Sequence, residues 1–289
     1  MHVRKAVIPA AGLGTRVLPA TKAVPKEMLN LVDKPVIQYI VEEAVTAGIT
    51  DILIITSRGK SAIEDHFDRT PELEARLEEG GKPGLLEEIR SLSNLANIHY
   101  IRQGETKGLG HAVLCAKAFV GNEPFAVLYG DGVIVGEEPA IGQLCKAYET
   151  YGKGVIGVKP VDLSVIRRYG SVSAKPLGER TFAVDDMVEK PQPHEVLSEY
   201  AVLDRCVLPP EIFDILEATP PGVGGEIQLT DAMKHLSNTK GMIAVHFTGK
   251  RYDMGNKLEI LKANVELGLS HPELGELFAR YLEDKAKKD

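Results

Sequence analysis

The chain has 289 residues, of which 44% are hydrophobic and 26% are charged, and its formal net charge is -7 at pH 7. This size and balance are typical of an ordinary soluble globular protein, either one large α/β domain or a domain with a lid. The negative charge argues against nucleic acid as a general partner, and no apolar run approaches the roughly 20 residues that cross a bilayer.

The three cysteines, Cys115, Cys145 and Cys206, stand far apart and lack the spacing of a metal or redox motif. This usage is typical of proteins in a reducing cytoplasm. The first residues lead directly into an apolar segment, without the hydrophobic core of a signal peptide. We therefore expect a cytoplasmic protein without a membrane segment.

In chain order, the first half alternates between short apolar runs typical of buried strands and segments with the period of about 3.6 residues typical of helices. We predict strands over residues 5–10, 51–56, 98–102 and 125–129, and helices over residues 35–47, 61–67 and 111–119. Residues 72–95 have a helical pattern that Gly80, Gly81 and Pro83 interrupt. This alternation implies a parallel sheet with right-handed crossovers, whose ligands lie outside the carboxyl ends of the strands.

From about Tyr151 onward, we predict strands over residues 155–159, 171–175, 182–189 and 201–208, with helices over 209–218 and 229–237. We interpret this part as a second half built onto the same sheet, not as a separate domain. Residues 258–269 and 272–288 are amphipathic and complete the chain as helices. The apolar stripe of Leu258, Leu261, Val265 and Leu269 either packs on the parent domain or forms a contact between subunits.

The most informative segment spans residues 9–29, PAAGLGTRVLPATKAVPKEML. Its small residues follow the first strand and let backbone N–H groups approach phosphate oxygens without a Cβ clash. Arg16 adds a planar cation and Lys26 a point charge, so the segment predicts a cradle for a triphosphate. Val17 stands where a dinucleotide fingerprint needs its third glycine, and the Gly-Lys-Ser/Thr ending of a P-loop is missing. Both of these commoner nucleotide loops are therefore excluded.

This segment resembles the signature of sugar-nucleotide pyrophosphorylases, and its residues are similar to those of the bacterial UTP–glucose-1-phosphate uridylyltransferases. The similarity continues almost to the C-terminus through further blocks in the same order. These blocks are Asp33-Lys34-Pro35, Ile37-Gln38-Tyr39, Glu64-Asp65-His66-Phe67-Asp68, Arg102-Gln103-Gly104, Lys107-Gly108-Leu109-Gly110-His111-Ala112, Val188-Glu189-Lys190-Pro191, Gly225-Glu226-Ile227-Gln228-Leu229-Thr230-Asp231-Ala232, and Asp253 with Gly255-Asn256-Lys257. The resemblance implies an α/β fold of the nucleotide-diphospho-sugar transferase type. Its Rossmann-like sheet is mixed, mostly parallel and flanked by helices, with a C-terminal helical segment.

The implied reaction joins UTP and α-D-glucose 1-phosphate, gives UDP-glucose and pyrophosphate, and uses Mg²⁺. The sugar phosphate attacks the α-phosphorus in line, and both reactants are polyanions, so catalysis depends on cations and positioning. The nucleophile is already an anionic phosphate oxygen and needs no general base. This suits a sequence without a convincing Ser-His-Asp or Cys-His constellation, and we interpret His111 as a helix-start or core histidine and not as a catalyst.

Arg16, Lys26 and Asp131 are the predicted catalytic residues. Arg16 and Lys26 would hold the triphosphate and neutralise the departing pyrophosphate, with a surface ion pair as the alternative for each. Mg²⁺ prefers one or two carboxylates plus phosphate oxygens, and the matching family positions imply Asp131 and Asp253 as its ligands. The alternative for Asp131 is a cap or turn residue. Lys22 and Lys34 could extend the basic cluster, although a solvated face is the favoured interpretation.

For the nucleotide, the resemblance implies contacts from Ala11, Gly12, Gly14, Glu27, Gln103 and Gly108. Ala11 and Gly12 would offer backbone groups to base and ribose. The Gln103 amide can donate to a carbonyl and accept from a ring N–H, which suits the edge of uracil, although a plain loop residue is the alternative. For the sugar phosphate, the resemblance implies Tyr169, Gly170, Glu189 and Lys190. An exposed Glu-Lys pair before a proline is common, so this last signal is weak by itself.

Four positions depart from the family pattern: Asn30 for proline, Gly132 for an acid or aliphatic residue, Glu199 for asparagine and Asp204 for glycine. The last two add negative charge where the sugar is expected. A carboxylate beside a phosphate is unfavourable unless it is paired, and Arg205 is the neighbouring candidate partner. These departures leave nucleotide binding intact and make the identity of the sugar an open question.

The expected organisation is an α/β nucleotidyltransferase domain over residues 1–257, with a nucleotide-binding half (1–150) and a sugar-binding half (151–257). Residues 258–289 form C-terminal helices that could assemble a homodimer or homotetramer. Two alternatives stay open: the same chemistry with another sugar 1-phosphate or with dTTP, and a non-catalytic paralogue that binds UDP-sugars and regulates a partner. A bare Rossmann-type oxidoreductase is disfavoured by the missing third glycine.

Overall fold

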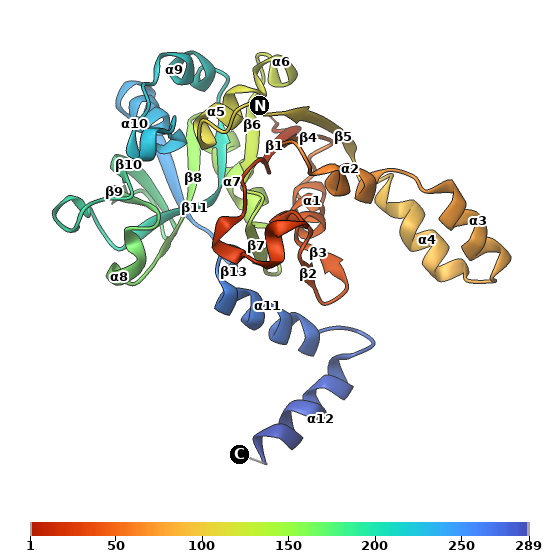
Figure 1. Cartoon of the computed structure of the whole chain (residues 1–289). Coiled ribbons are helices and arrows are strands. Elements are labelled where there is room, and N and C mark those ends of the chain that lie inside the picture. The colour runs from red at the N-terminus through yellow and green to blue at the C-terminus, as the bar shows by residue number, and fades with distance from the viewer. Residues whose placement is uncertain (1, 288–289) are drawn as a thin grey trace.

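The computed structural model describes residues 2–287. Its centre is a nine-stranded mixed sheet within these residues (Figure 1). In spatial order the strands are β5 (Asn97–Arg102), β4 (Asp51–Thr56), β1 (Lys5–Pro9), β6 (Phe125–Leu128), β11 (Tyr200–Leu208), β8 (Gly154–Pro160), β12 (Met242–His246), β10 (Thr181–Glu189) and β9 (Gly170–Pro176). The α/β fold class expected from the sequence is therefore confirmed.

The first half of the chain forms the parallel part of the sheet. Strands β5, β4, β1 and β6 run parallel to one another, as the alternation of strands and helices predicted. The connecting helices are α1 (Val36–Thr46), α2 (Ser61–Phe67), α3 (Pro71–Glu79), α4 (Pro83–Leu92), α5 (Leu109–Leu114) and α6 (Lys117–Val120). The α3–α4 hairpin projects from the body (Figure 1). Its two helices are separated at Gly80, Gly81 and Pro83, where the sequence predicted an interruption. The single helix predicted over residues 111–119 is wrong in detail, because the chain forms α5 and α6 there.

The second half joins the same sheet through β11, which lies antiparallel between β6 and β8. Strand β12 runs parallel to β8, and β10 pairs antiparallel with both β12 and β9. The helices of this half are α8 (Leu163–Ile166), α9 (Ile212–Ala218) and α10 (Leu229–Lys240), and α7 (Ala140–Tyr151) precedes β8. Helices α7 and α8 and strand β12 were not predicted from the sequence.

Two small antiparallel ribbons were also not predicted. One joins β2 (Asn30–Leu31) to β3 (Lys34–Pro35), and the other joins β7 (Gly132–Val135) to β13 (Lys250–Asp253). Such short strands carry little apolar periodicity, so their pairing depends on tertiary context. The β7–β13 ribbon matters for function because it places Gly132 directly opposite Asp253.

The hydrophobic core lies on both faces of the sheet. Successive side chains of β1 point to opposite faces, so Ile8 belongs to the same core cluster as Ile40 of α1, while Val7 belongs to a second cluster with Phe213 of α9. All four of these side chains are buried. The two layers of helices hold the strand ends in place, and the site is built at those ends.

The C-terminal helices are α11 (Lys257–Leu269) and α12 (Gly275–Ala286), and α12 packs on α11 and extends away from the body (Figure 1). Their predicted apolar stripe faces outward: Leu258 is 58% exposed and Leu261 is 64% exposed, and Val265 and Leu269 are exposed as well. Packing on the parent domain therefore does not describe these four side chains. The subunit contact stays a prediction. Within residues 2–287, no helix is long and apolar enough to cross a membrane.

Candidate active site

Two cavities open at the carboxyl ends of the central strands. The smaller, of about 400 Å³, is lined by residues that include Ala11, Gly12, Lys26, Gln103 and Gly108. The larger, of about 950 Å³, is lined by residues that include Arg16, Tyr169, Gly170, Glu189, Lys190 and Asp253. Both cavities share Leu109, Tyr129, Asp131 and Glu226 in their walls. Most of the residues predicted for the nucleotide and all of those predicted for the sugar phosphate thus gather in two cavities that meet at Asp131.

The glycine segment forms one wall of the smaller cavity. Strand β1 ends at Pro9, and the Ala10 N–H then donates to the Ile55 carbonyl at 2.8 Å, which anchors the loop to β4. Gly14 has a φ of 66°, a left-handed conformation that favours glycine, and its carbonyl accepts from Thr21 Oγ1 at 2.7 Å. Gly14 is absent from the walls of both cavities and turns the chain here, and its contact with the nucleotide stays a prediction.

The second glycine segment is shaped by close packing. Gly108 has a φ of 100°, and a Cβ there would lie 2.7 Å from both Glu226 Cβ and the Ile227 carbonyl. The Gln103 amide nitrogen donates to the Gly108 carbonyl at 3.1 Å and lies 2.9 Å from His111 Nδ1. His111 therefore orients Gln103 from the start of α5, which agrees with its interpretation as a helix-start histidine.

Glu27 lies behind the cavity wall and not in it. Its side chain is fully buried and accepts from Lys60 Nζ at 2.8 Å, while its Oε1 has no hydrogen-bond partner among residues 2–287. Lys60 Nζ also donates to the Ala10 carbonyl at 2.5 Å. Burial raises the pKa of the Glu27 carboxyl and lowers the pKa of the Lys60 ammonium. A direct contact from Glu27 to the nucleotide stays a prediction.

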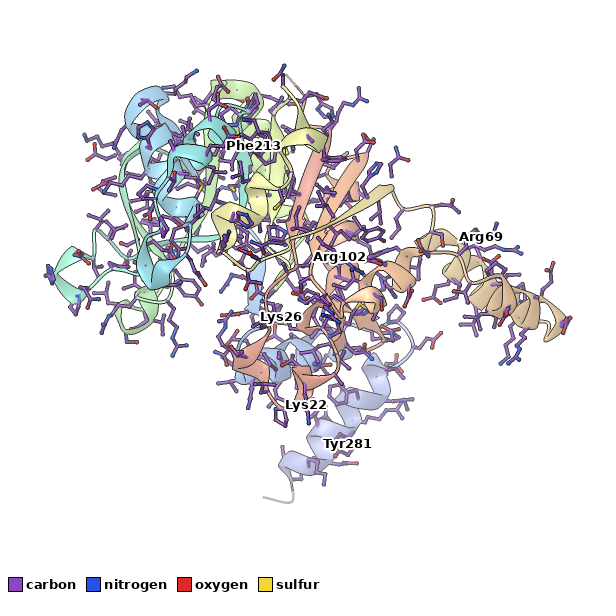
Figure 2. The ribbon with its side chains drawn as sticks, turned by 45° about the horizontal axis from the view of Figure 1, so that its top comes forward. Lys22, Lys26, Arg69, Arg102, Phe213 and Tyr281 are labelled. Carbon is purple, nitrogen blue, oxygen red and sulfur yellow. The ribbon has the colours of Figure 1, made fainter. Side chains whose placement is uncertain are left out.

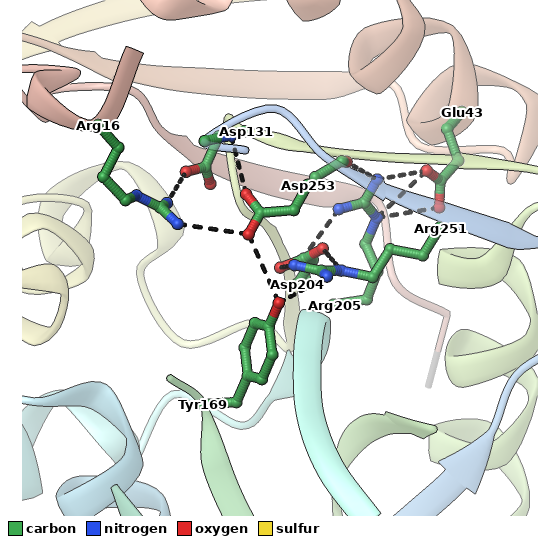
Figure 3. A network of polar contacts seen from close by, with 10 residues as sticks. Arg16, Glu43, Asp131, Tyr169, Asp204, Arg205, Arg251 and Asp253 are labelled. Atoms are coloured by element: carbon green, nitrogen blue, oxygen red, sulfur yellow. Dashed lines mark hydrogen bonds and ion pairs between the residues drawn. The ribbon is translucent and has the colours of Figure 1, made fainter. Parts of the chain in front are cut away.

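Four charged side chains, Arg16, Lys26, Asp131 and Asp253, meet where the cavities join, and Figure 3 shows three of them, Arg16, Asp131 and Asp253. Asp131 Oδ2 lies 2.7 Å from Lys26 Nζ and 3.1 Å from Arg16 NH2, and Asp253 Oδ2 lies 3.3 Å from Arg16 NH1. Burial raises the pKa of the Asp131 carboxyl, but Lys26 and Arg16 outweigh it and hold that pKa below its usual range. Burial lowers the pKa of Lys26, and Asp131 outweighs this in turn, so that pKa is raised. Both groups are therefore charged at neutral pH.

The two aspartates fit a hard divalent cation. Their carboxylates converge on one guanidinium, that of Arg16, so a single positive charge already bridges them. All of the donors are oxygens, which suits Mg²⁺. Within residues 2–287, no cluster of three or more His, Cys, Asp or Glu side chains is arranged to hold a metal. A cation held by Asp131 and Asp253 would therefore take its other ligands from phosphate oxygens or water.

Of the further lysines, Lys34 pairs with Glu42 at 3.0 Å and Lys22 is exposed. Figure 2 shows Lys26 near the centre of the molecule and Lys22 farther toward the C-terminal helices. The interpretation of Lys22 and Lys34 as a solvated face agrees with both placements.

The sugar-side residues come from the β9–β10 pair and α10. Gly170 is the register partner of Glu189, whose Oε2 accepts from Thr230 Oγ1 at 2.7 Å. Lys190 follows in a left-handed conformation with a φ of 45°, and its N–H donates to the Tyr169 carbonyl at 2.9 Å. Lys190 Nζ lies 3.7 Å from Glu189 and is partly exposed, so its charge faces the larger cavity.

The expected pairing of Asp204 with Arg205 is wrong. Neighbouring residues of a strand point to opposite faces, and the buried Arg205 reaches Glu43 of α1 at 2.6 Å. The Asp204 carboxylate pairs instead with Arg251 of β13, with Oδ1 3.1 Å from NH2 (Figure 3). Glu199 is exposed and outside both cavities, so only Asp204 changes the charge of the sugar side.

Three functional residues were not predicted: Lys60, Arg251 and Thr230. Arg251 stands two residues before Asp253 on one strand, and this spacing places both side chains on the same face. Thr230 lies inside the block over residues 225–232 that resembles the family, and this resemblance was the available signal for it. For Lys60, a lone lysine after a strand, the sequence carried no signal.

Comparisons with known proteins identify the family to which this chain is similar. The family model described as "Nucleotidyl transferase" matches residues 5–269. UTP–glucose-1-phosphate uridylyltransferase YngB of Bacillus subtilis (strain 168) is 54% identical over 99% of this chain and 97% of the relative. A second UTP–glucose-1-phosphate uridylyltransferase of the same strain is 52% identical over 99% of this chain and 98% of the relative.

Solved structures show the same relationship. A UTP-bound UGPase from Acinetobacter baumannii superposes with a TM-score of 0.90, at 41% identity over 97% of this chain and 98% of that one. A UDP-glucose pyrophosphorylase complexed with UDP-glucose superposes with a TM-score of 0.82, at 40% identity over 91% of this chain and 97% of that one. The chain therefore belongs to the nucleotidyl transferase family, in the branch of the UTP–glucose-1-phosphate uridylyltransferases.

Proposed function

We propose that this enzyme makes UDP-glucose and pyrophosphate from UTP and α-D-glucose 1-phosphate. The observation that carries the proposal is the shared wall of the two cavities, in which Asp131 forms ion pairs with Lys26 and Arg16. One cavity offers the glycine loop and Gln103, and the other offers Glu189 and Lys190. Two substrates held in these cavities would bring their phosphates together at Asp131.

The reaction is a single displacement at the α-phosphorus. A phosphate oxygen of glucose 1-phosphate forms the new P–O bond, and the bond between the α-phosphorus and the bridging oxygen to the β-phosphate breaks. That bridging oxygen leaves with pyrophosphate and keeps the electron pair. No proton transfer is required at the nucleophile, so the enzyme contributes charge neutralisation and alignment.

Lys26 and Arg16 lower the repulsion between the two anionic substrates. Lys26 is held in a mostly buried position, with 16% of its side chain exposed, so its charge acts through little intervening water. Arg16 is more exposed, at 57%, and its planar guanidinium can follow the β- and γ-phosphates as they leave. A magnesium ion bound by Asp131 and Asp253 would supply further positive charge to the phosphate oxygens.

The remaining predicted residues select and orient the substrates. Ala11 and Gly12 offer backbone to the nucleotide, and Gln103 reads the uracil edge. Glu27 supports the loop from behind, because Lys60 links its carboxylate to the Ala10 carbonyl. On the sugar side, Glu189 accepts from hexose hydroxyls and is held by Thr230, while Lys190 binds the sugar phosphate.

The test is pyrophosphate release with Mg²⁺, in which UTP, dTTP, ATP and GTP are crossed with the 1-phosphates of glucose, galactose, glucosamine and mannose. We expect UTP with glucose 1-phosphate to dominate. A different preferred sugar or dTTP would keep the chemistry and overturn the specificity. No turnover with any pair, while UDP-glucose still binds, would favour a regulatory UDP-sugar-binding protein.

We also propose that the exposed stripe on α11 joins copies of this chain into a homodimer or homotetramer. The stripe carries two leucines that are each more than half exposed, Leu258 and Leu261. Light scattering of the wild type and of a Leu261→Glu variant tests this. A monomeric wild type would overturn the proposal.

A further inference from the structure

Asp204 packs against the β7–β13 ribbon, beside Gly132 of β7 and Arg251 of β13. Asp131 directly precedes β7, Asp253 ends β13, and Gly132 of β7 is the register partner of Asp253. The Asp204 carboxylate fills the space beside Gly132 so closely that a Cβ on residue 132 would overlap it. Any side chain at position 132 is therefore excluded while Asp204 keeps its place.

The backbone at Asp204 has a conformation that suits glycine. Asp204 has a φ of 55°, and it lies where the register of β11 against β8 shifts between Val202 and Cys206. Its carbonyl accepts from the Tyr129 N–H at 2.9 Å, which fixes this irregular backbone against the segment leading to Asp131. Among non-glycine residues, aspartate and asparagine adopt this conformation most readily, and positive-φ residues of this kind concentrate at functional sites.

The Asp204 side chain holds Arg251, and Arg251 lies beside Asp253. The carboxylate and guanidinium are both mostly buried, with 7% and 13% of the side chains exposed. Arg251 NH1 donates to Tyr169 Oη at 3.3 Å, and its guanidinium lies over the Tyr169 ring at 5.1 Å from the centroid. Tyr169 Oη in turn donates to Asp253 Oδ2 at 3.5 Å (Figure 3). A chain of contacts thus runs from Asp204 to Asp253.

Without its partner, the Arg251 cation would be left buried and uncompensated. An arginine guanidinium stays charged in proteins, and the Asp204 carboxylate is its ion-pair partner here. The next carboxylate on the same face of β13 is Asp253, two residues away. An Arg251 released by Asp204 would pair with Asp253 and compete with a metal ion for its oxygens.

We propose that Asp204 is a positioning residue that holds Arg251 away from Asp253. We also propose that positions 132 and 204 form a reciprocal pair, in which one position carries the carboxylate that binds Arg251 and the other must be glycine. The proposal rests on the proposed function only in assigning the metal to Asp131 and Asp253. It explains why a carboxylate is tolerated in the sugar-side wall: its charge is neutralised by Arg251.

The pair can be exchanged without a change in net charge. An aspartate at position 132 would start from the space that the Asp204 carboxylate fills, within reach of Arg251. A glycine at position 204 would accept the positive φ and vacate that space. The double variant Gly132→Asp/Asp204→Gly should therefore restore the stability that Gly132→Asp loses and the Mn²⁺ affinity that Asp204→Gly loses.

The experiment compares the wild type with Asp204→Asn, Asp204→Gly, Gly132→Asp and the double variant. Asparagine tolerates the left-handed backbone, so Asp204→Asn removes only the charge. This variant keeps the test valid if Asp204→Gly fails to fold. The readouts are Mn²⁺ affinity by electron paramagnetic resonance, UDP-glucose affinity without metal by calorimetry, and kcat and KM for UTP at varied Mg²⁺.

For both Asp204 variants we expect about tenfold weaker Mn²⁺ affinity and about tenfold more Mg²⁺ for half-maximal rate, as for other groups that orient metal ligands. Metal-free UDP-glucose affinity should change less than threefold, which separates positioning from a general structural loss. Gly132→Asp should lower thermal stability, and the double variant should recover both its stability and its Mn²⁺ affinity to within about threefold of the wild type.

Unchanged Mn²⁺ affinity in Asp204→Asn would overturn the positioning role. A double variant no better than the weaker single variant would overturn the reciprocal pair. Because Mn²⁺ and UDP-glucose binding are measured without turnover, a wild type that binds both and makes no UDP-glucose would contradict the proposed function alone.

Discussion

Lys26 Nζ lies 2.7 Å from Asp131 Oδ2, so the cation proposed for the triphosphate and the carboxylate proposed for the metal neutralise each other. Arg16 makes the same kind of contact with Asp131 and Asp253. Two carboxylates and two cations balance in charge at the point where the cavities join. A metal ion and a triphosphate also carry opposite charges. The metal ion can bind the carboxylates while the triphosphate binds Lys26 and Arg16, and no buried charge is then left uncompensated.

Asp131→Asn should abolish most turnover while the fold survives. The substitution keeps the shape of the side chain and removes the charge, and we expect kcat to fall about 100- to 1,000-fold, as for the loss of one transition-state charge contact. Pyrophosphate release measures the effect, and circular dichroism checks the fold. Asp185→Asn is the matched control, since Asp185 is an exposed carboxylate paired with Lys175. A normal rate for Asp131→Asn would remove Asp131 from the mechanism.

Lys26→Gln should weaken triphosphate binding and slow the reaction. The ammonium is mostly buried beside Asp131, so its loss removes a desolvated charge and leaves the carboxylate unpaired. We expect kcat/KM for UTP to fall about 100-fold or more. Lys22→Gln, four residues earlier and exposed, is the control and should leave kcat/KM unchanged. Equal effects of the two substitutions would show that only the general charge of the segment matters.

Lys60→Met should destabilise the protein by about 3–5 kcal/mol, because it leaves the buried Glu27 carboxylate without its cation. Urea unfolding measures the free energy. Lys240→Met removes an exposed ion pair with Glu211 and should cost at most about 1 kcal/mol.

The double variant Glu27→Gln/Lys60→Met separates the charge from the packing. It should be more stable than Lys60→Met alone, because no carboxylate is then left unpaired. If the double variant is the less stable of the two, the ion pair does not explain the effect.

The α3–α4 hairpin should lose stability in acid. Arg69 and Arg90 donate to the Glu74 carboxylate, with 4% of that side chain exposed, and lower its pKa from 4.5 to about 2. A folded-state pKa below the unfolded value gives a stabilising contribution that is complete above pH 4.5 and is lost as the pH falls toward about 2.

Urea midpoints of the wild type and Glu74→Gln should therefore differ at pH 7, and the difference should shrink near pH 3. Glu78→Gln is the control, since Glu78 is 69% exposed and 3.8 Å from Arg90. A difference between wild type and Glu74→Gln that is independent of pH would show that the Glu74 carboxylate is not the cause.

The parts of the fold that could be predicted from the sequence are those that local pattern determines. The apolar run of β1 and the stripe of α1 report burial directly, and the glycine segment after β1 requires a turn with exposed backbone. The β7–β13 ribbon could not be predicted, because it pairs short strands that lie far apart in the chain. Local sequence pattern does not bring Asp253 beside Gly132, and only the family resemblance placed Asp253 with Asp131.

Side-chain direction limited the prediction of the site. Asp204 and Arg205 are neighbours in sequence, but a strand sends them to opposite faces, toward Arg251 and Glu43. Glu27 follows Lys26 directly, yet Lys26 reaches Asp131 while Glu27 turns inward to Lys60. The motif marks both residues along the chain, and only the packed structure shows that their side chains point to different partners.

The measurement that tests the central claim most directly is isotope exchange between radiolabelled pyrophosphate and UTP. Cavities that meet at Asp131 predict that both substrates are bound together and that the uridylyl group passes directly between them. Exchange should therefore require glucose 1-phosphate and be absent without it. Exchange at the full rate with no sugar phosphate present would mean that the enzyme itself carries the uridylyl group, and it would contradict the account.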